Sequence, residues 1–271
     1  MTDAARSPVP EPPAGLTDIH VHLGPSDTGE LYYPHLTPDE WLEMAEASDI
    51  ARAVAFAPTN HAGYAQANAE LARVAAGSGG RIRAFARLSG PEMPLDEAPG
   101  WLWRRAVKRR LRPPDPGLAP EALETFAGVK LLPQLDGVPG KRHFEAIADL
   151  RLPVLCHSGR MVPPRWIARR ILPRTTGPVI VAHLGQFPDA IDLAAEAYAL
   201  ARSDPRVWLD TSGIWRRDQL RHPDMPWDRL VFGSDCPLTH PRVAWDQVAR
   251  ALPDPGLAAR IGRDAAEEIL S

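Results

Sequence analysis

The sequence predicts a single (β/α)8 TIM barrel, and three observations support this prediction. The chain has 271 residues, a length that suits one domain with an ordinary hydrophobic core. Short apolar runs, each bounded by Gly, Pro or Arg, recur eight times along it. Amphipathic stretches lie between most of these runs, and this alternation is typical of parallel strands joined by helices.

The eight apolar runs are rich in Val, Ile, Leu, Phe and Ala, as expected for strands that are buried on both faces of a parallel sheet. An open doubly wound sheet is the alternative architecture, but no G-x-G-x-x-G motif follows an early run. In chain order, the expected strands cover residues 16–23, 51–58, 81–88, 127–133, 152–159, 178–185, 206–213 and 229–236.

Helices are expected between the strands. The first begins with Thr37 as the N-cap, Pro38 at the first helical position and Glu40 as the capping-box partner of Thr37. The later helices share apolar residues at helical spacing. They are expected over residues 64–76, 144–150, 166–172, 190–201, 243–252 and 257–270.

One connection, after the third expected strand, is much longer than the others and reads as an insertion. Between residues 101 and 112 it carries Trp101, Trp103 and then six basic residues. A basic helix could contact an anionic substrate or a membrane surface, whereas such a run is more often a solvated face. We expect the solvated face.

Composition excludes several classes of protein. The formal net charge of −3 argues against a nucleic-acid-binding surface. The two cysteines, Cys156 and Cys236, are too few for a disulfide scaffold and fit a reducing cytoplasm. No apolar run approaches the roughly 20 residues of a membrane span, and the N-terminus has no signal-peptide pattern.

These features predict a cytoplasmic protein with a simple domain organisation. Residues 1–15 are rich in Pro and small residues and are expected to form a flexible arm, while residues 16–271 form the barrel. The expected partner is a small-molecule substrate, with no nucleic acid and no membrane. A homodimer is left open.

Polar residues gather at the expected carboxyl ends of the strands. Asp18, His20 and His22 alternate along the first strand, so the pleat directs all three to one face. The carboxyl ends of barrel strands meet at one mouth, where barrel enzymes keep their active sites. The other candidates at this mouth are Lys130 on the fourth expected strand and His157, His183 and Asp235 at the ends of the fifth, sixth and eighth.

Imidazole nitrogens and a carboxylate that meet at one mouth are suitable ligands for a divalent transition metal. A single histidine at a strand end is more often a hydrogen-bonded core residue. Agreement among five strands is much harder to obtain by chance, so the sequence predicts a metal site.

The motifs that carry these residues resemble those of the amidohydrolase superfamily, and within it the amidohydrolase-2 group of metal-dependent hydrolases and decarboxylases. The closing motif departs from the family at Asp264, where Asn is usual, in a place remote from the chemistry. In the order of the family, the resembling segments are TDIHVHLG, GVKLLP, LPVLCHSG, VAHLG, WLDTSG, FGSDCP and IGRDAAEEIL.

The resemblance implies that His20, His22, His157 and Asp235 are metal ligands. It also implies that His183 is either a ligand of a second metal or a proton-transfer residue. The counterpart of Asp235 commonly takes a proton from the metal-bound water as well. Zinc is the expected ion, with manganese and iron as alternatives, and one or two ions are expected.

Lys130 has two alternative roles. In binuclear members of the superfamily a lysine of the fourth strand is carboxylated by carbon dioxide and bridges two metals. Otherwise Lys130 neutralises the acidic site or holds a substrate carboxylate. A protonated lysine beside a divalent cation is strongly disfavoured, so the bridging role requires carboxylation.

The expected function is a metal-dependent hydrolase that acts on a carboxylic ester, lactone or amide of a small molecule. A bound metal lowers the pKa of its water from about 15.7 towards 7. Asp235 is then expected to move the proton, and His183 to orient or polarise the substrate. A non-oxidative decarboxylase is the alternative, and a non-catalytic binding barrel is a third reading.

Several further residues are assigned by position. Asp18 lies deeper than His20 and is expected to be a structural carboxylate. Arg87 ends the third expected strand and either clamps a substrate carboxylate or is structural. Cys156 is expected to turn away from the metal and to be buried, because it adjoins His157. Trp215, after the seventh expected strand, is placed to line the pocket.

Overall fold

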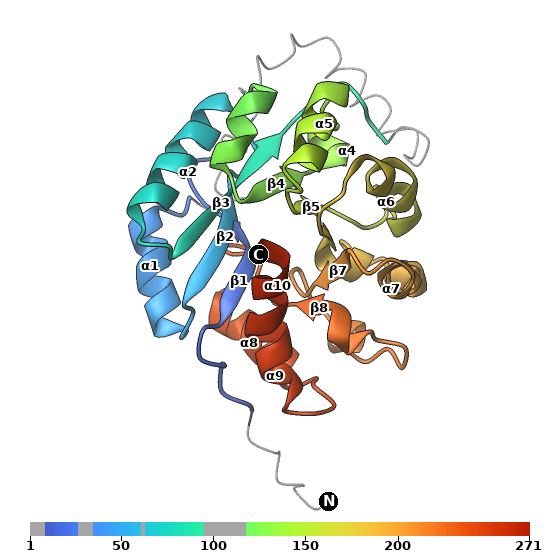
Figure 1. The fold of residues 1–271 in the computed structure, drawn as a ribbon. Helices are drawn as coiled ribbons and strands as arrows, with labels where there is room; N and C mark the ends of the chain where they lie inside the picture. The colour runs from blue at the N-terminus through green and yellow to red at the C-terminus, as the bar shows by residue number, and fades with distance from the viewer. Residues whose placement is uncertain (1–8, 27–34, 61–62, 95–117) are drawn as a thin grey trace, which may run out of the picture.

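The computed structural model describes residues 9–26, 35–60, 63–94 and 118–271. Eight parallel strands pair in the order of the sequence and form a nearly closed barrel (Figure 1), which confirms the predicted (β/α)8 fold. The strands are β1 (Thr17–His22), β2 (Arg52–Phe56), β3 (Ile82–Leu88), β4 (Gly128–Leu131), β5 (Val154–Cys156), β6 (Val179–Val181), β7 (Val207–Asp210) and β8 (Leu230–Val231).

The barrel closes between the segment that follows β8 and the first strand, β1. The backbone N–H of Ile19 donates to the carbonyl of Phe232 at 3.0 Å, and that of His22 donates to the carbonyl of Cys236 at 2.7 Å. In the other direction, the N–H of Asp235 donates to the carbonyl of His20 at 3.0 Å. The loop that contains Asp235 is therefore tied to the strand that carries both histidines.

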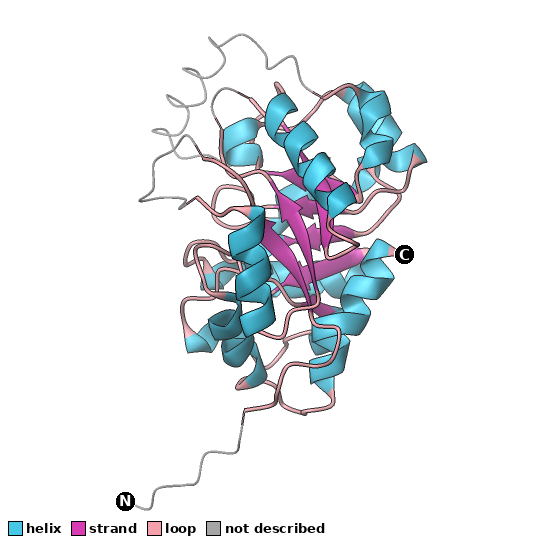
Figure 2. Cartoon of the chain, turned by 90° about the vertical axis from the view of Figure 1, so that its left-hand side faces the viewer, coloured by secondary structure: helices cyan, strands magenta, loops and turns pink. Residues whose placement is uncertain are grey.

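Helices surround the strands (Figure 2). The first begins as predicted, because the Thr37 side chain accepts from the N–H of Glu40 and the Glu40 carboxylate accepts from the N–H of Thr37. The α-helices are α1 (Pro38–Ala47), α2 (Ala65–Gly77), α4 (Pro133–Asp136), α5 (Lys141–Asp149), α6 (Pro164–Arg170), α7 (Ala194–Ser203), α8 (Pro241–Ala249), α9 (Leu257–Ala259) and α10 (Ala265–Leu270).

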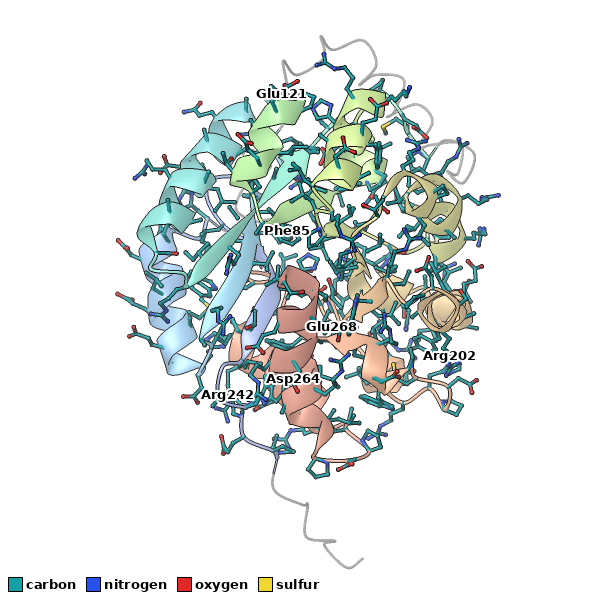
Figure 3. All side chains as sticks on the ribbon, in the orientation of Figure 1. Phe85, Glu121, Arg202, Arg242, Asp264 and Glu268 are labelled. Carbon is teal, nitrogen blue, oxygen red and sulfur yellow. The ribbon has the colours of Figure 1, made fainter. Side chains whose placement is uncertain are left out.

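The C-terminal helix α10 covers one end of the barrel, and side chains fill the space inside the ring of strands (Figures 1 and 3). Nη2 of Arg52, the first residue of β2, lies 3.5 Å from Oε1 of Glu267 in α10. The covered end of the barrel is therefore the end where the strands begin. The opposite, carboxyl end carries the predicted site. The inner core cluster includes Ile19, Val54, Phe56, Phe85, Leu155, Ile180, Trp208 and Val231 from the strands and Ala265, Ala266 and Ile269 from α10.

Two expectations from the sequence fall partly or wholly outside the described ranges. The basic stretch 101–112 lies outside them, and so do residues 1–8 of the expected arm. Within the described ranges, none of the helices combines the length and the apolar character that a membrane crossing needs.

Candidate metal centre

The six residues predicted to form the site come from five parts of the barrel, and none of them is more than 9% exposed. His20 and His22 lie on β1 and Lys130 on β4, while His157 directly follows β5. All of these positions are at the carboxyl half of the barrel, opposite α10.

The predicted positions of three site residues need a correction. His157 was expected to end the fifth strand but lies one residue beyond β5, which ends at Cys156. We expected His183 and Asp235 to end strands, but β6 ends at Val181 and β8 at Val231, so both residues lie in the connections that follow. Both have left-handed backbones, with φ of 58° for His183 and 65° for Asp235. Residues other than glycine rarely adopt this conformation, and where they do it is often at a functional site.

One group of side chains has the geometry of a metal site. His20 Nε2 lies 3.4 Å and His22 Nε2 lies 3.1 Å from Asp235 Oδ1, and the three atoms are mutually within 4.8 Å. Two ligands bonded at about 2.0–2.1 Å to a tetrahedral ion lie about 3.3 Å from each other. We call His20, His22 and Asp235 the ligand triad, because their donor atoms are already at ligand spacing.

The charge states of the site also suit a cation. Burial lowers the pKa of His22 to about 3 and that of His183 to about 4, so both rings are neutral at pH 7. Burial opposes ionisation of Asp235, but the His20 ring and the hydrogen bond from His22 outweigh it and hold the Asp235 pKa below its usual range. Neutral imidazoles and an ionised carboxylate are the forms that bind divalent metals.

Lys130 reaches the same place from β4. Its Nζ lies 3.2 Å from His20 Nε2 and 4.5 Å from the centre of the Phe56 ring. Burial lowers the pKa of Lys130 to about 8. The amine thus contacts the imidazole nitrogen that a metal would use, which agrees with both roles that the sequence left open.

His157 and His183 form a second contact beside the ligand triad. His183 Nε2 and His157 Nδ1 are 3.1 Å apart. Phe187 packs against both rings at 4.9 Å between centroids, and Trp215, which is 59% exposed, packs against Phe187 at 5.5 Å. Among the described residues, two groups have metal-ligand spacing, namely the ligand triad and the set of His20, His183 and Asp210, and His157 belongs to neither.

Asp210 and Ser212 are functional candidates that the sequence reading missed. Asp210 ends β7, and its Oδ2 lies 2.7 Å from Nδ1 of His20. The hydroxyl of Ser212 lies 3.0 Å from that same Nδ1 and 2.9 Å from Nδ1 of His183. The segment WLDTSG does carry a signal, because its aspartate stands near the end of the seventh expected strand, where the strand ends meet at the mouth.

Asp18 has the surroundings of a structural carboxylate. It accepts hydrogen bonds from the N–H of His20 at 3.1 Å, from the N–H of Ser234 at 2.9 Å and from the Ser234 hydroxyl at 2.6 Å. Burial raises the pKa of Asp18 to about 6. Its oxygens connect β1 to the segment after β8, and among the described residues it is in neither group with metal-ligand spacing.

Arg87 is engaged by the protein rather than held open for a substrate. Its Nε and Nη2 donate to Asp136 Oδ2 at 2.9 and 2.8 Å, and Nη1 donates to the carbonyl of Ala57 at 2.9 Å. Cys156 is fully buried, as expected. Asp264 lies directly before α10 (Figure 3) and accepts from Arg263 Nε at 2.8 Å. Because α10 covers the end of the barrel where the strands begin, this departure from the family is at the end opposite the ligand triad.

Comparison with known structures finds the same fold in several enzymes. A 2,6-dihydroxybenzoate decarboxylase from Rhizobium is 16% identical, with a TM-score of 0.59 and coverage of 95% of this chain and 99% of that one. A probable 2-pyrone-4,6-dicarboxylic acid hydrolase from Acinetobacter baumannii is 14% identical, with a TM-score of 0.61 and coverage of 94% and 99%.

A dihydroxybenzoic acid decarboxylase from a Polaromonas species, with bound manganese and an inhibitor, is 15% identical. Its TM-score is 0.59, and the match covers 95% of this chain and 97% of that one. No curated protein sequence matches the chain. The model of the amidohydrolase family, of the amidohydrolase-2 type, matches residues 17–271. Because this match covers nearly the whole chain, the protein belongs to the amidohydrolase family.

Proposed function

We propose that this protein is a metal-dependent hydrolase that acts on a carboxylic ester, lactone or amide of a small molecule. The observation that carries the proposal is the ligand triad, in which two imidazole nitrogens lie 3.4 and 3.1 Å from one carboxylate oxygen. The proposed ion is zinc, with manganese or iron as alternatives. A metal held by the ligand triad would supply a water of lowered pKa and would polarise the bond to be attacked.

Asp235 is proposed as the residue that moves the proton. Its Oδ1 faces His20 and His22, and an ionised carboxylate offers about four lone-pair sites on its two oxygens. The same group can therefore face a cation and accept a proton. Its lowered pKa keeps it ionised at neutral pH, the form that a general base needs.

His183 is proposed to orient or polarise the substrate. It lies beside both His157 and Phe187, and its neutral ring can donate or accept a hydrogen bond. Lys130 is proposed either as a carboxylated ligand that bridges two ions or as an amine that holds a substrate carboxylate. Its contact with His20 is compatible with each role.

A non-oxidative decarboxylase is the second candidate. Two of the three similar structures described above are named as decarboxylases, and one of these contains manganese. The ligand triad would serve that reaction equally well, because the metal would hold the substrate while an acid protonates a carbon. The difference lies in the electrophile, which is a carbonyl carbon for the hydrolase and a proton for the decarboxylase.

One experiment separates these candidates. The purified protein, supplied in turn with zinc, manganese and iron, is given a panel of lactones, esters and amides and a panel of hydroxylated aromatic carboxylic acids. Acid release from the first panel, with no carbon dioxide from the second, is the result expected for the hydrolase. Release of carbon dioxide alone would favour the decarboxylase. Metal binding without turnover of either panel would favour the non-catalytic barrel.

A further inference from the structure

Asp210, Ser212, His20 and His183 form one hydrogen-bonded group, which we call the Asp210 group. Each of the four residues is at most 3% exposed, so hydrogen bonds within the protein fix the positions of their protons. Asp210 Oδ1 accepts from the backbone N–H groups of His183 and Ser212, both at 2.9 Å, and from the Ser212 hydroxyl. Asp210 Oδ2 faces Nδ1 of His20 at 2.7 Å.

The tautomer of His20 follows from its two neighbours. A carboxylate only accepts hydrogen bonds, so Nδ1 of His20 must carry the proton that it donates to Asp210. On the other side of the ring, Nε2 lies 3.2 Å from Nζ of Lys130 and 3.4 Å from Oδ1 of Asp235. The Lys130 contact is the shorter one and is the hydrogen bond, and an ammonium only donates. Both contacts give the same result, in which Nδ1 is protonated and Nε2 is not.

The tautomer of His183 follows from the single proton of Ser212. That hydroxyl donates its proton to Asp210, so its oxygen is left to accept from Nδ1 of His183 at 2.9 Å. Gly213 leaves room for this contact, because a Cβ at residue 213 would lie 2.7 Å from Nδ1 of His183. Nε2 of His183 is then unprotonated and accepts from Nδ1 of His157 at 3.1 Å.

We propose that Asp210 is a positioning residue that fixes the tautomers of two site histidines, His20 directly and His183 through the hydroxyl of Ser212. Both rings then have a protonated Nδ1 and an unprotonated Nε2. His20, His183 and Asp210 also have metal-ligand spacing, but the hydroxyl of Ser212 lies between them and makes this a proton-holding group. The expected contribution of Asp210 to metal affinity rests on the proposed function, whereas the two tautomers are inferred from the hydrogen bonds alone.

The first test uses the metal-free wild-type protein. Its histidines are labelled with 15N and 13C, assigned by single substitutions, and the tautomer of each ring is read by NMR at neutral pH. We expect both His20 and His183 to show the Nδ1–H tautomer. An Nε2–H tautomer on either ring would overturn the proposal, and this measurement depends on no Asp210 variant that has to fold.

The second test is Asp210→Asn, which should switch the tautomer of His20 and leave the tautomer of His183 unchanged. Oδ1 has three donors and Oδ2 has one, so the amide oxygen should take the place of Oδ1. The amide NH₂ then faces His20 Nδ1 and switches His20 to the Nε2–H tautomer, while His183 keeps its own. Because His20 Nε2 would then carry a proton, zinc affinity should fall by about 10–100-fold, the usual effect of losing such a partner.

The complementary variant is Ser212→Ala. It keeps the contact between Asp210 and His20, so metal affinity and the His20 tautomer should stay near wild type. Only His183 loses its fixed tautomer. If Asp210 and Ser212 were purely structural, both variants would have a lower melting temperature. Asp210→Asn would then not switch the tautomer of His20, and Ser212→Ala would not release the tautomer of His183.

Asp18→Asn is the matched control. Asp18 is also a buried carboxylate that accepts from two backbone N–H groups and a serine hydroxyl, but among the described residues its side chain forms no hydrogen bond with an imidazole ring. We expect a loss of stability with unchanged tautomers. Zinc binding by equilibrium dialysis separates the two hypotheses: a wild type that binds no metal contradicts the proposed function, whereas equal affinity and equal tautomers in wild type and Asp210→Asn contradict the role of Asp210.

Discussion

His22 and Asp235 lie 213 positions apart in the sequence, yet His22 Nε2 and Asp235 Oδ1 are 3.1 Å apart in the folded chain. The two residues also belong to the two segments that close the barrel, because the N–H of His22 donates to the carbonyl of Cys236, the neighbour of Asp235. The ligand triad is therefore complete only when the first strand and the segment after the last strand have come together.

Metal binding should stabilise the folded chain for this reason. An unfolded chain holds His22 and Asp235 far apart, so a metal binds the closed barrel much better and stabilises it by mass action. At about 100 times its Kd, the metal should add about 2.7 kcal/mol to the free energy of unfolding. Urea unfolding of metal-free and zinc-loaded protein measures this difference, and coincident curves would contradict the prediction.

The double variant His20→Ala and His22→Ala should lose the metal. It removes two of the three atoms in the ligand triad, whereas the inner core cluster beneath the site is unchanged. Freshly purified wild type should contain at least about one equivalent of zinc, manganese or iron, and the double variant should contain almost none. Elemental analysis gives the metal content, and circular dichroism checks that the barrel still folds. A metal-free wild type that no added ion activates would contradict the assignment.

Lys130 tests whether the site holds a second ion. If Lys130 is carboxylated, the metal content should approach about two equivalents and rise when bicarbonate is supplied, because the carbamate is a bridging anionic ligand. Lys130→Ala should lower the metal content, with partial recovery when a short carboxylic acid is added. The same variant without the acid is the control. A plain amine at Lys130 beside a single metal, seen crystallographically, would leave only the mononuclear site.

The existence of the eight strands could be predicted from sequence because burial on both faces leaves a direct composition signal. Their ends could not be predicted as well. The run 229–236 is apolar and short, yet β8 covers only Leu230–Val231, because the residues after it bond to β1 by individual contacts rather than as a regular ladder. Apolar composition reports burial, and buried loop residues have the same composition as strand residues.

The predicted boundary between a flexible arm, residues 1–15, and the barrel, residues 16–271, remains a prediction.

The candidate site also has features that could not be predicted from local sequence. His183 and Asp235 were expected to end strands, whereas they lie buried in the connections after β6 and β8, and their left-handed backbones have no signal in the local sequence. Asp210 was missed because its role depends on a ring 190 positions away. A strand-end carboxylate becomes interpretable only when the partner that it faces is known.

Removal of one partner from the buried ion pair between Arg87 and Asp136 should strongly destabilise the fold. Both side chains are at most 1% exposed, and Asp136 also accepts from the hydroxyl of Tyr64 at 2.9 Å. Asp136→Asn removes the charge that compensates the buried guanidinium, which typically costs about 3–5 kcal/mol. Urea unfolding measures the loss. Glu70→Gln, which breaks the exposed pair with Arg73, is the control and should leave stability nearly unchanged.

Asp235→Asn tests the chemistry at the ligand triad. Asparagine has nearly the shape of aspartate and keeps an oxygen that can face His20 and His22, but it has almost no basicity. If Asp235 moves the proton, the variant should keep much of its metal and substrate affinity. Its kcat should nevertheless fall by about 10²–10⁴-fold, the usual contribution of a positioned acid–base group.

The design of this measurement decides how it is read. Metal content and kcat have to be determined on the same sample at saturating metal, so that loss of the ion is not mistaken for loss of the base. Asp18→Asn supplies the matched change, since it converts another buried carboxylate that is in neither group with metal-ligand spacing among the described residues. If Asp235→Asn kept near-normal turnover with metal in place, the proton would have to be moved by another group. His183 would then be the first candidate, because its neutral ring lies in the same buried cluster and can both accept and donate a proton.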